Sequence, residues 1–447
     1  MSEPLVLVVE GVRAGTLTQS RHGTLTLTYE DNYQRHPNAT PLSVSMPLAI
    51  KEHHGKNVRN WLSNLLPDNV QVLDRWATQF RVSAGSPFAL LRHVGRDIAG
   101  AFQFVPESDI GDLDDGGIDW LDDSLLAQRL AELKLDPAAW TPQMAAGMFS
   151  LSGAQAKIAI RWEEGRWGLP YGSQATTHIL KPYWDGLPGH AINEHLSLRL
   201  GARVGLAAAS SEILSIGNAT VISVRRYDRV VLDEQSIGRV HQEDMCQALS
   251  LPPSKKYESE GGPGIASIVN MLRRNLPVAV AQDTVTRFLQ AQALAWAMAA
   301  TDAHAKNYSL LLAQDAVALA PLYDVSSAAP YFVNEVRDVR PGEVSMHKAG
   351  LAMKVSKHRK FNEITAQDWK TLADQVGLHP EETVSLVAAV VQRVPSATAE
   401  VVELFNQEPG RTPSERKFAD TYKTAVKRQA TLALRSIEGK GIPTRRP

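Results

Sequence analysis

The chain is nearly free of cysteine: Cys246 is the only one among its 447 residues. A disulfide within the chain is therefore excluded, and so is a metal site built from several cysteines. Cys246 lies in the segment HQEDMCQALS, whose helical spacing predicts a buried side chain.

Long hydrophobic runs are also missing. The N-terminus reads MSEPLVLVVEGVRAG, and its apolar run of five residues ends at Glu10. Such a run is too short for the core of a signal peptide or for a membrane span. We therefore predict a cytoplasmic protein without a membrane partner.

A large net charge of either sign is absent too. Forty-seven basic residues against forty-eight acidic residues give a formal charge of -1. Any contact with nucleic acid therefore has to come from a local basic patch. Hydrophobic residues make up 44% and charged residues 21%, as in an ordinary globular protein, and the length allows two or three domains.

Strand-forming segments dominate the N-terminal part of the sequence. The runs LVLVVE, VRAGTLT and TLTLTY, between residues 5 and 29, are separated by glycine and predict a small meander of strands. Helices are expected in NWLSNLLPDNVQVLDRWATQF, which contains Pro67, and a closing strand in AGAFQFVPE. These features predict a β-rich subdomain over residues 1–107 and an acidic, glycine-containing connecting loop within residues 108–147.

Strand patterns return over residues 148–240, in KIAIRW, GRWGLP, THILKPY and SEILSIGNATVISVRRYDR, with one amphipathic segment between them. Over residues 241–447 the pattern is nearly all helical. There Thr365 and Asp368 have the spacing of a capping box, and Pro380 is suited to open another helix. The expected fold class is α+β.

The segment AMAATDAHAKNYSLLL, residues 297–312, begins as an alanine-rich apolar run and then carries four polar side chains close together: Asp302, His304, Lys306 and Asn307. Asp302 and Asn307 have the spacing of the catalytic Asp and the metal-binding Asn of protein kinases, and Asp324 follows in LAPLYDVSS. In phosphoryl transfer one carboxylate orients and deprotonates the acceptor hydroxyl, while a second carboxylate and an amide oxygen hold magnesium. Structural explanations stand beside this one: a capped helix end for the D-x-x-x-x-N pair, a helix cap for Asp324, and a hydrogen-bonded loop histidine for His304.

The phosphates of a nucleotide need a strand lysine and a flexible loop whose N–H groups approach the oxygen atoms. Lys181 in THILKPY has apolar neighbours on a predicted strand, and SLSGAQAK, residues 150–157, precedes the strand KIAI. Alternatively, Lys181 is a solvated lysine at a strand end and SLSGAQAK is only a turn. The order of these features along the chain favours a nucleotide site.

Several unusual local motifs carry a resemblance to a known family. They are PLSVSMPL, NLLPDN, SGAQAK, THILKP, QEDMCQ, KYESEGGPGI, TDAHAKNYS and LYDVSSA. Over nearly its whole length the chain resembles the HipA family of toxin serine/threonine kinases, bacterial partners of the HipB antitoxin. The resemblance implies a two-lobe, protein-kinase-like α+β fold with an extra N-terminal β-rich subdomain and an all-helical C-terminal lobe. It also implies ATP and Mg2+ as the cofactor pair.

The resemblance also implies roles for individual residues. Asp302 matches the family's catalytic base, Asn307 and Asp324 its magnesium ligands, and Lys181 its ATP-phosphate lysine. Further ATP-binding positions match the nucleotide-covering loop (Ser152, Gly153, Ala154, Gln155, Ala156, Lys157), the hinge strand beside adenine (Arg225, Arg226, Tyr227) and the pocket lining (His304, Ala305, Lys306, Tyr323).

In this family a serine of the loop is autophosphorylated, which expels the loop and silences the kinase, and Ser150 matches that position. A doubly charged phosphate beside bound ATP disfavours the closed loop by repulsion. Three positions depart from the family pattern. Ala303 stands where glycine is frequent, Arg225 where an acidic residue is common, and Ser152 replaces a small apolar residue, so Ser152 is a second candidate for modification.

Partners are implied by the resemblance as well. Family members phosphorylate aminoacyl-tRNA synthetases, chiefly glutamyl-tRNA synthetase, and so halt translation and favour persistence. With a HipB-type helix-turn-helix antitoxin they bind operator DNA as co-repressors. In KVSKHRK, residues 354–360, the side chains of Lys357, Arg359 and Lys360 are candidates for phosphate contacts to that DNA, and a solvated basic loop is the alternative.

Three hypotheses follow from these observations. The leading one is an ATP-dependent protein serine/threonine kinase that acts as a toxin and is restrained by an antitoxin and by its own phosphorylation. The second is a catalytically idle kinase fold that serves as a scaffold and co-repressor. The third is a small-molecule or lipid phosphotransferase, because the catalytic groups alone do not specify the acceptor.

Overall fold

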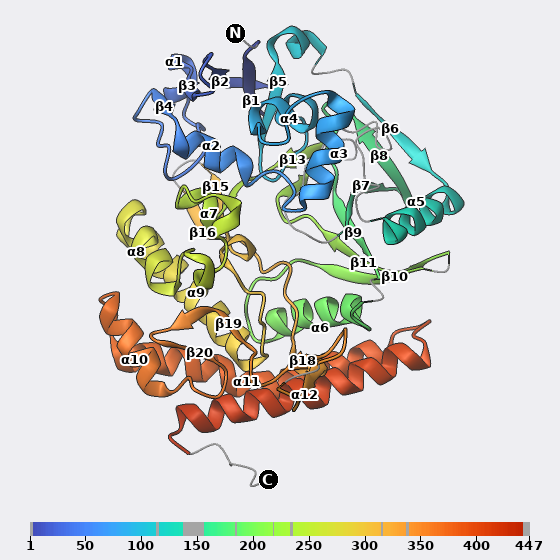
Figure 1. Ribbon diagram of the computed structural model, residues 1–447, viewed down its shortest axis with the longest axis vertical. Helices are drawn as coiled ribbons and strands as arrows, with labels where there is room; N and C mark the ends of the chain where they lie inside the picture. Colours follow the sequence, from blue (N-terminus) through green and yellow to red (C-terminus); the bar gives the residue numbers. More distant parts are fainter. Residues whose placement is uncertain are drawn as a thin grey trace. The chain divides into compact units, whose positions relative to one another are not determined.

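A computed structural model gives the structure of the chain (Figure 1). It describes residues 3–112, 116–136, 156–183, 186–217, 219–232, 236–313, 316–336 and 339–440. The predicted loop positions Ser150, Ser152, Gly153, Ala154 and Gln155 lie outside the described residues.

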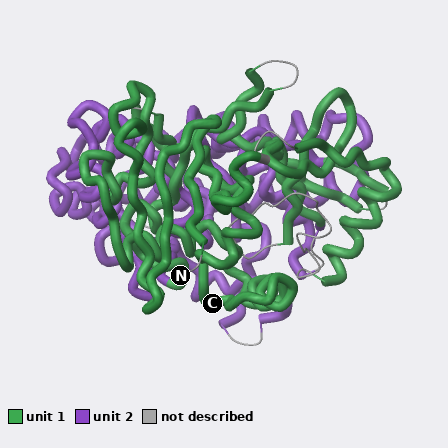
Figure 2. Tube along the Cα trace, turned by 90° about the horizontal axis from the view of Figure 1, so that it is seen from above, with its two compact units in different colours: residues 1–182, 214–254, 309–320 green, residues 183–213, 255–308, 321–447 purple. Residues whose placement is uncertain are grey.

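The chain divides into two compact units, coloured separately in Figure 2. The first unit comprises residues 1–182, 214–254 and 309–320, and the second comprises residues 183–213, 255–308 and 321–447. Each unit therefore combines segments that are far apart in the sequence. Asp302, Asn307 and Asp324 all belong to the second unit, whereas Lys181 belongs to the first.

The predicted N-terminal meander is confirmed as part of a five-stranded antiparallel sheet in the first unit. In spatial order its strands are β4 (Glu52–His54), β3 (Leu25–Tyr29), β2 (Val12–Gln19), β1 (Leu5–Val9) and β5 (Phe102–Pro106). In β3 the alternation of LTLTY buries Leu25, Leu27 and Tyr29 on one face. The core under this sheet also takes apolar side chains from α2 (Lys56–Ser63), α3 (Val70–Phe80) and α4 (Pro87–Val94).

The chain also forms a six-stranded sheet. Its spatial order is β10 (Ser211–Ile216), β11 (Ala219–Arg225), β9 (His178–Pro182), β7 (Ile158–Glu163), β8 (Arg166–Tyr171) and β6 (Gly117–Leu121). Helix α5 (Asp123–Leu135) buries Leu126 and Leu130 in the core shared with β7 and β9. β6 lies in the stretch that the sequence predicted to be a connecting loop, and this expectation was wrong. Its backbone pairs with β8, a strand far along the chain, and a local pattern cannot reveal such a partner.

Shorter elements complete the first unit. They are α1 (Asp31–Gln34), the paired strands β12 (Arg229–Val231) and β13 (Ile237–Arg239), the sheet of β14 (His241–Asp244), β15 (Ser309–Ala313) and β16 (Ala316–Leu319), and α7 (Met245–Ala248). Cys246 is fully buried in α7, as predicted.

The second unit is mainly helical. Its helices are α6 (His190–Arg203), α8 (Ile265–Asn275), α9 (Val278–Ala297), α10 (Ala366–Gln375), α11 (Pro380–Gln407) and α12 (Pro413–Ile437). Two strand pairs accompany them: β17 (Phe332–Val333) with β18 (Val344–Ser345), and β19 (Gly350–Val355) with β20 (His358–Lys360). Short strands thus also occur beyond residue 240, where only helices were expected, because each contributes a few residues and carries too little periodicity to be recognised.

Two predicted helix starts are confirmed. The carboxylate of Asp368 accepts hydrogen bonds from the backbone N–H (2.9 Å) and hydroxyl (2.7 Å) of Thr365 and so closes the capping box of α10. Pro380 occupies the first turn of α11. Among the described residues, no helix combines the length and the apolar composition that crossing a membrane requires.

Candidate active site

The segment with the predicted catalytic residues begins where α9 ends. Ala299 adopts a left-handed conformation (φ 57°), and the N–H of Ala300 bonds to the carbonyl of Ala295 at 2.8 Å. This geometry ends the helix and turns the chain away from its axis. Asp302 follows directly, in a loop, and its side chain is 61% exposed.

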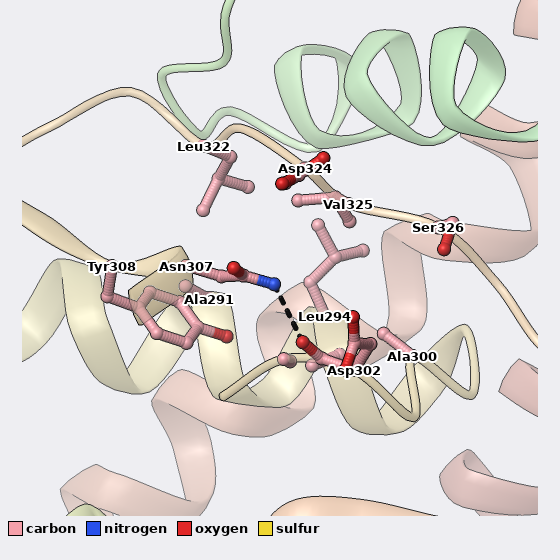
Figure 3. A pocket seen from close by; sticks show the side chains of 12 residues that line it. Ala291, Leu294, Ala300, Asp302, Asn307, Tyr308, Leu322, Asp324, Val325 and Ser326 are labelled. Carbon is pink, nitrogen blue, oxygen red and sulfur yellow. Dashed lines mark hydrogen bonds between the residues drawn. The ribbon is translucent and has the colours of Figure 1, made fainter. Parts of the chain in front are cut away.

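A tight turn joins the two predicted catalytic-loop residues. The side-chain amide of Asn307 donates to the backbone carbonyl of Asp302 at 2.7 Å (Figure 3). The N–H of His304 bonds to the same carbonyl at 2.8 Å, and the N–H of Asn307 bonds to the carbonyl of His304 at 3.0 Å. Because the amide nitrogen of Asn307 is used inside the turn, its amide oxygen is the group left to accept from or coordinate a ligand.

Asp324 is held between two anchored points of the second unit. On one side, the backbone of Leu322 exchanges hydrogen bonds of 2.8 Å with the segment at Ala207 and Ala209. On the other side, Ser327 is clamped by the side chain of Asn193, which accepts from its N–H at 2.8 Å and donates to its carbonyl at 2.7 Å. Asp324 itself has a left-handed backbone (φ 57°), which aspartate tolerates better than most residues. No α-helix begins directly after Asp324 in this described stretch, so the helix-cap explanation fails.

Asp302, Asn307 and Asp324 line the same pocket (Figure 3). Apolar side chains of α9 and of the segment around Leu322 form part of its wall: Ala291, Leu294, Ala295, Leu322 and Val325. One carboxylate and one amide oxygen suit Mg2+, which commonly takes one or two carboxylates from a protein and completes its shell with phosphate oxygens and water. The residues present therefore fit this metal.

Two other predicted lining residues, Tyr323 and Ala305, make hydrogen bonds that hold the loop in place. The hydroxyl of Tyr323 donates to the carbonyl of Lys306 at 2.6 Å. The N–H of Ala305 bonds to the carbonyl of Lys256 at 3.2 Å. His304 is 5% exposed, and its Nε2 lies 4.0 Å from Oδ1 of Asp302. Burial lowers the pKa of His304, and the Asp302 carboxylate only partly opposes this, so the imidazole is neutral at pH 7.

Lys181 lies in β9 opposite Ile222 of β11, and it is only 4% exposed. The alternative of a solvated strand-end lysine is therefore wrong. Of the nucleotide-covering loop, Ala156 and Lys157 are described and half-buried, immediately before β7.

The predicted hinge residues are found at the end of β11. Arg225 is exposed, whereas Arg226 is buried and pairs with Asp228 at 2.8 Å. The hydroxyl of Tyr227 donates to the side chain of Gln242. The Arg226 side chain is thus committed to the interior of the first unit, and its backbone N–H bonds to the carbonyl of Thr177 at 2.9 Å.

The predicted DNA-contact residues lie on the hairpin of β19 and β20. Lys357, Arg359 and Lys360 are all exposed, and Lys360 approaches Glu363 at 3.7 Å. This exposure is compatible with both phosphate contacts and a solvated hairpin.

Sequence reasoning missed the residues that hold the site together. Asn193 and Ser327 fix the segment after Asp324, and the hydroxyl of Tyr257 donates to Oδ1 of Asp302. Asn193 and Tyr257 lie far in the sequence from the residues that they support, so spacing gives no signal for them. The local hints are that Tyr257 belongs to the unusual motif KYESEGGPGI and Ser327 to the motif LYDVSSA.

Two families match the sequence: the HipA N-terminal domain over residues 5–105 and the HipA-like C-terminal domain over residues 149–398. The chain belongs to the HipA family. The resemblance inferred from the local motifs is thereby confirmed, and with it membership of a family of kinase toxins.

Curated relatives of this HipA-family chain are similar over most of their length. Y4mE of Sinorhizobium fredii (strain NBRC 101917 / NGR234), which carries kinase in its name, is 34% identical over 402 residues, or 88% of this chain and 90% of the relative. The serine/threonine-protein kinase toxin HipA of Shewanella oneidensis is 30% identical over 428 residues, or 90% of this chain and 89% of the relative.

A solved structure of the Shewanella oneidensis HipA, HipB and operator DNA complex matches the HipA-family fold with a TM-score of 0.81 at 26% identity. The match covers 98% of this chain and 99% of that one. The predicted α+β, kinase-like fold class is confirmed, and β6 and the short strands beyond residue 240 are differences of detail.

Proposed function

We propose that this HipA-family chain is an ATP- and Mg2+-dependent serine/threonine protein kinase and the toxin of a HipBA-type pair in the cytoplasm. The observation that carries the proposal is the turn in which the Asn307 amide bonds to the Asp302 carbonyl while Asp324 lines the same pocket. This arrangement brings a candidate proton acceptor and two candidate metal ligands to one pocket.

The residues divide the chemistry of phosphoryl transfer among themselves. Asp302 accepts the proton of the acceptor hydroxyl as that oxygen bonds to the γ-phosphorus and the bond to ADP breaks. Asn307 and Asp324 hold Mg2+, which when bound neutralises charge on the phosphate oxygens. Lys181, with Ala156 and Lys157 and the remaining loop residues, binds the phosphates, and the backbone of residues 225–227 contacts adenine.

A protein is the proposed acceptor. The Asp302 side chain is 61% exposed in the second unit, which is suited to a hydroxyl presented on a macromolecule. Family resemblance makes an aminoacyl-tRNA synthetase, such as glutamyl-tRNA synthetase, the proposed target. Phosphorylation of Ser150, or of Ser152, is the proposed silencing step.

A HipB-type antitoxin is the proposed partner, since a solved relative of the same fold is a complex of HipA, HipB and operator DNA. The exposed Lys357, Arg359 and Lys360 are proposed to contact the phosphates of that DNA. Replacing all three with alanine should then reduce the salt dependence of operator binding by the toxin–antitoxin complex, with a slope change of about one per lost contact. An unchanged slope would favour a solvated hairpin.

The acceptor class is tested with γ-labelled ATP, the purified chain and two acceptors, purified glutamyl-tRNA synthetase and a protein-free metabolite extract, with buffer as the control without acceptor. We expect label on the synthetase that depends on Asp302. Label in small molecules alone would favour the small-molecule phosphotransferase, and no transfer with intact ATP binding would favour the scaffold.

A further inference from the structure

Tyr257 contacts the proposed catalytic base directly. Its hydroxyl donates to Oδ1 of Asp302, and its ring packs edge-on against the ring of His304, with centroids 4.8 Å apart. His304 approaches the same carboxylate oxygen, with Nε2 at 4.0 Å. Both side chains thus lie on the Oδ1 side of the carboxylate and leave Oδ2 for another group.

The backbone around Tyr257 is fixed at both ends. The carbonyl of the preceding Lys256 accepts from Ala305 in the turn that carries Asn307, at 3.2 Å. The carbonyl of Tyr257 accepts from the N–H groups of Glu260 (3.0 Å) and Gly262 (2.9 Å). The phenol is therefore held by a closed loop that is itself bonded to the catalytic segment.

Gly262 is required by the closure of this loop. A Cβ at this position would lie 2.1 Å from the carbonyl oxygen of Lys255 and 2.7 Å from that of Tyr257. Backbone atoms cannot yield as a flexible side chain does, so any larger residue displaces the loop.

We propose that Tyr257 is a positioning residue for phosphoryl transfer, whose hydroxyl holds one carboxylate oxygen of Asp302 so that the other meets the acceptor hydroxyl. This inference rests on the proposed kinase activity. An aspartate side chain exposed to this extent samples several rotamers, and a hydrogen bond from a fixed donor selects one of them. Tyr257 acts through Asp302 and does not itself exchange a proton with the acceptor.

The inference is tested by Tyr257→Phe, which removes one oxygen atom and keeps the ring against His304. We expect kcat to fall by about 10-fold to 100-fold, because a hydrogen bond to a charged group is lost and the base is misplaced. The KM for ATP, the Kd for ATP and the thermal midpoint should stay close to those of the wild type.

Tyr33→Phe is the matched control. The Tyr33 hydroxyl is buried in the first unit, where it donates to the carbonyl of Thr40 at 2.9 Å. This variant should lower the thermal midpoint and leave kcat unchanged. A kcat of Tyr257→Phe within twofold of the wild type would overturn the inference, and so would a loss that parallels weaker ATP binding and a lower thermal midpoint.

A second variant, Gly262→Ala, moves the loop while keeping the hydroxyl. A comparable fall in kcat is expected, and full activity would contradict the role given to the loop. If the wild type transfers no phosphate to any acceptor, the proposed function fails, and a crystal structure of Tyr257→Phe then decides the inference alone. If the Asp302 carboxylate keeps a single orientation in that structure, without the phenol hydroxyl, the inference that Tyr257 positions it is wrong.

Discussion

At the scale of single residues, the site depends on backbone and side-chain groups that support one another. The sequence pointed to Asp302, Asn307 and Asp324 because their types and spacing match what phosphoryl transfer needs. The supporting groups were not visible in the sequence, since Asn193 and Ser327 come together only through the packing of the second unit. Spacing identifies the atoms that react, whereas tertiary structure identifies the atoms that hold them.

Asn307→Ala tests the assignment of the metal ligand. We expect the Mg2+ concentration for half-maximal activity to rise by roughly 10-fold to 100-fold, because the variant loses an oxygen ligand and the bond to the Asp302 carbonyl. Titrating Mg2+ at saturating ATP measures this shift.

Asn275→Ala is the control for that variant, since the Asn275 amide also donates to a backbone carbonyl, at 3.0 Å, but at the end of α8. Equal Mg2+ dependence in the wild type and Asn307→Ala would show that Asn307 is not a metal ligand.

At the scale of elements, local signals located strands and helices well where the chain alternates clearly or carries a cap. They failed for β6, an edge strand in an acidic stretch whose partner β8 is distant in sequence. Helix α11 shows the converse, because it continues through Pro395 although a proline inside a helix costs about 3 kcal/mol. Its buried valines, among them Val391, Val394 and Val401, pack in the second unit and outweigh the local penalty.

The capping box of α10 makes a prediction at this scale. Asp368 accepts two hydrogen bonds from Thr365 and lies 2.9 Å from Nδ1 of His358 in β20. Asp368→Ala should lower the free energy of unfolding by about 1–2 kcal/mol and the thermal midpoint by a few degrees. Asp374→Ala, at an exposed position of the same helix, serves as the control. Equal midpoints for the two variants would show that the capping box contributes no stability.

At the scale of the whole molecule, the α+β class followed from the order of strand-rich and helix-rich segments, and the kinase-like fold was implied by the resemblance to the HipA family. The division into two units did not follow from that order, because β15 pairs with β14 across a long stretch of chain that belongs to the other unit. Such pairings depend on tertiary folding, and a single sequence gives no measure of them.

Buried histidines make the stability of the molecule sensitive to acid. Burial lowers the pKa of His178 to about 4, of His195 to about 3 and of His241 to about 4. Each folded-state pKa is below its unfolded value, so the unfolded state binds more protons and stability is lost as the pH falls below about 6.5. Burial acts in the opposite direction on Glu243, raising its pKa to about 7, so that this group destabilises the fold as the pH rises toward 7.

His195→Gln isolates one of these contributions. Burial and the guanidinium groups of Arg199 and Arg411 keep His195 neutral. Between pH 7 and pH 5, we expect the wild type to lose about 2 kcal/mol more unfolding free energy than this variant. Denaturation of both at the two pH values, with the exposed His22→Gln as control, measures the difference. The same pH dependence in the wild type and His195→Gln would refute it.

The central claim, that Asp302 serves as the base of an ATP-dependent protein kinase, is tested most directly by intact-mass analysis. Wild type and Asp302→Gln, both confirmed to be unphosphorylated and able to bind ATP, are incubated with Mg2+ and ATP, and any modified peptide is mapped. We expect the wild type alone to gain one phosphate, on Ser150 or Ser152. Equal phosphate incorporation by the two proteins would contradict the account.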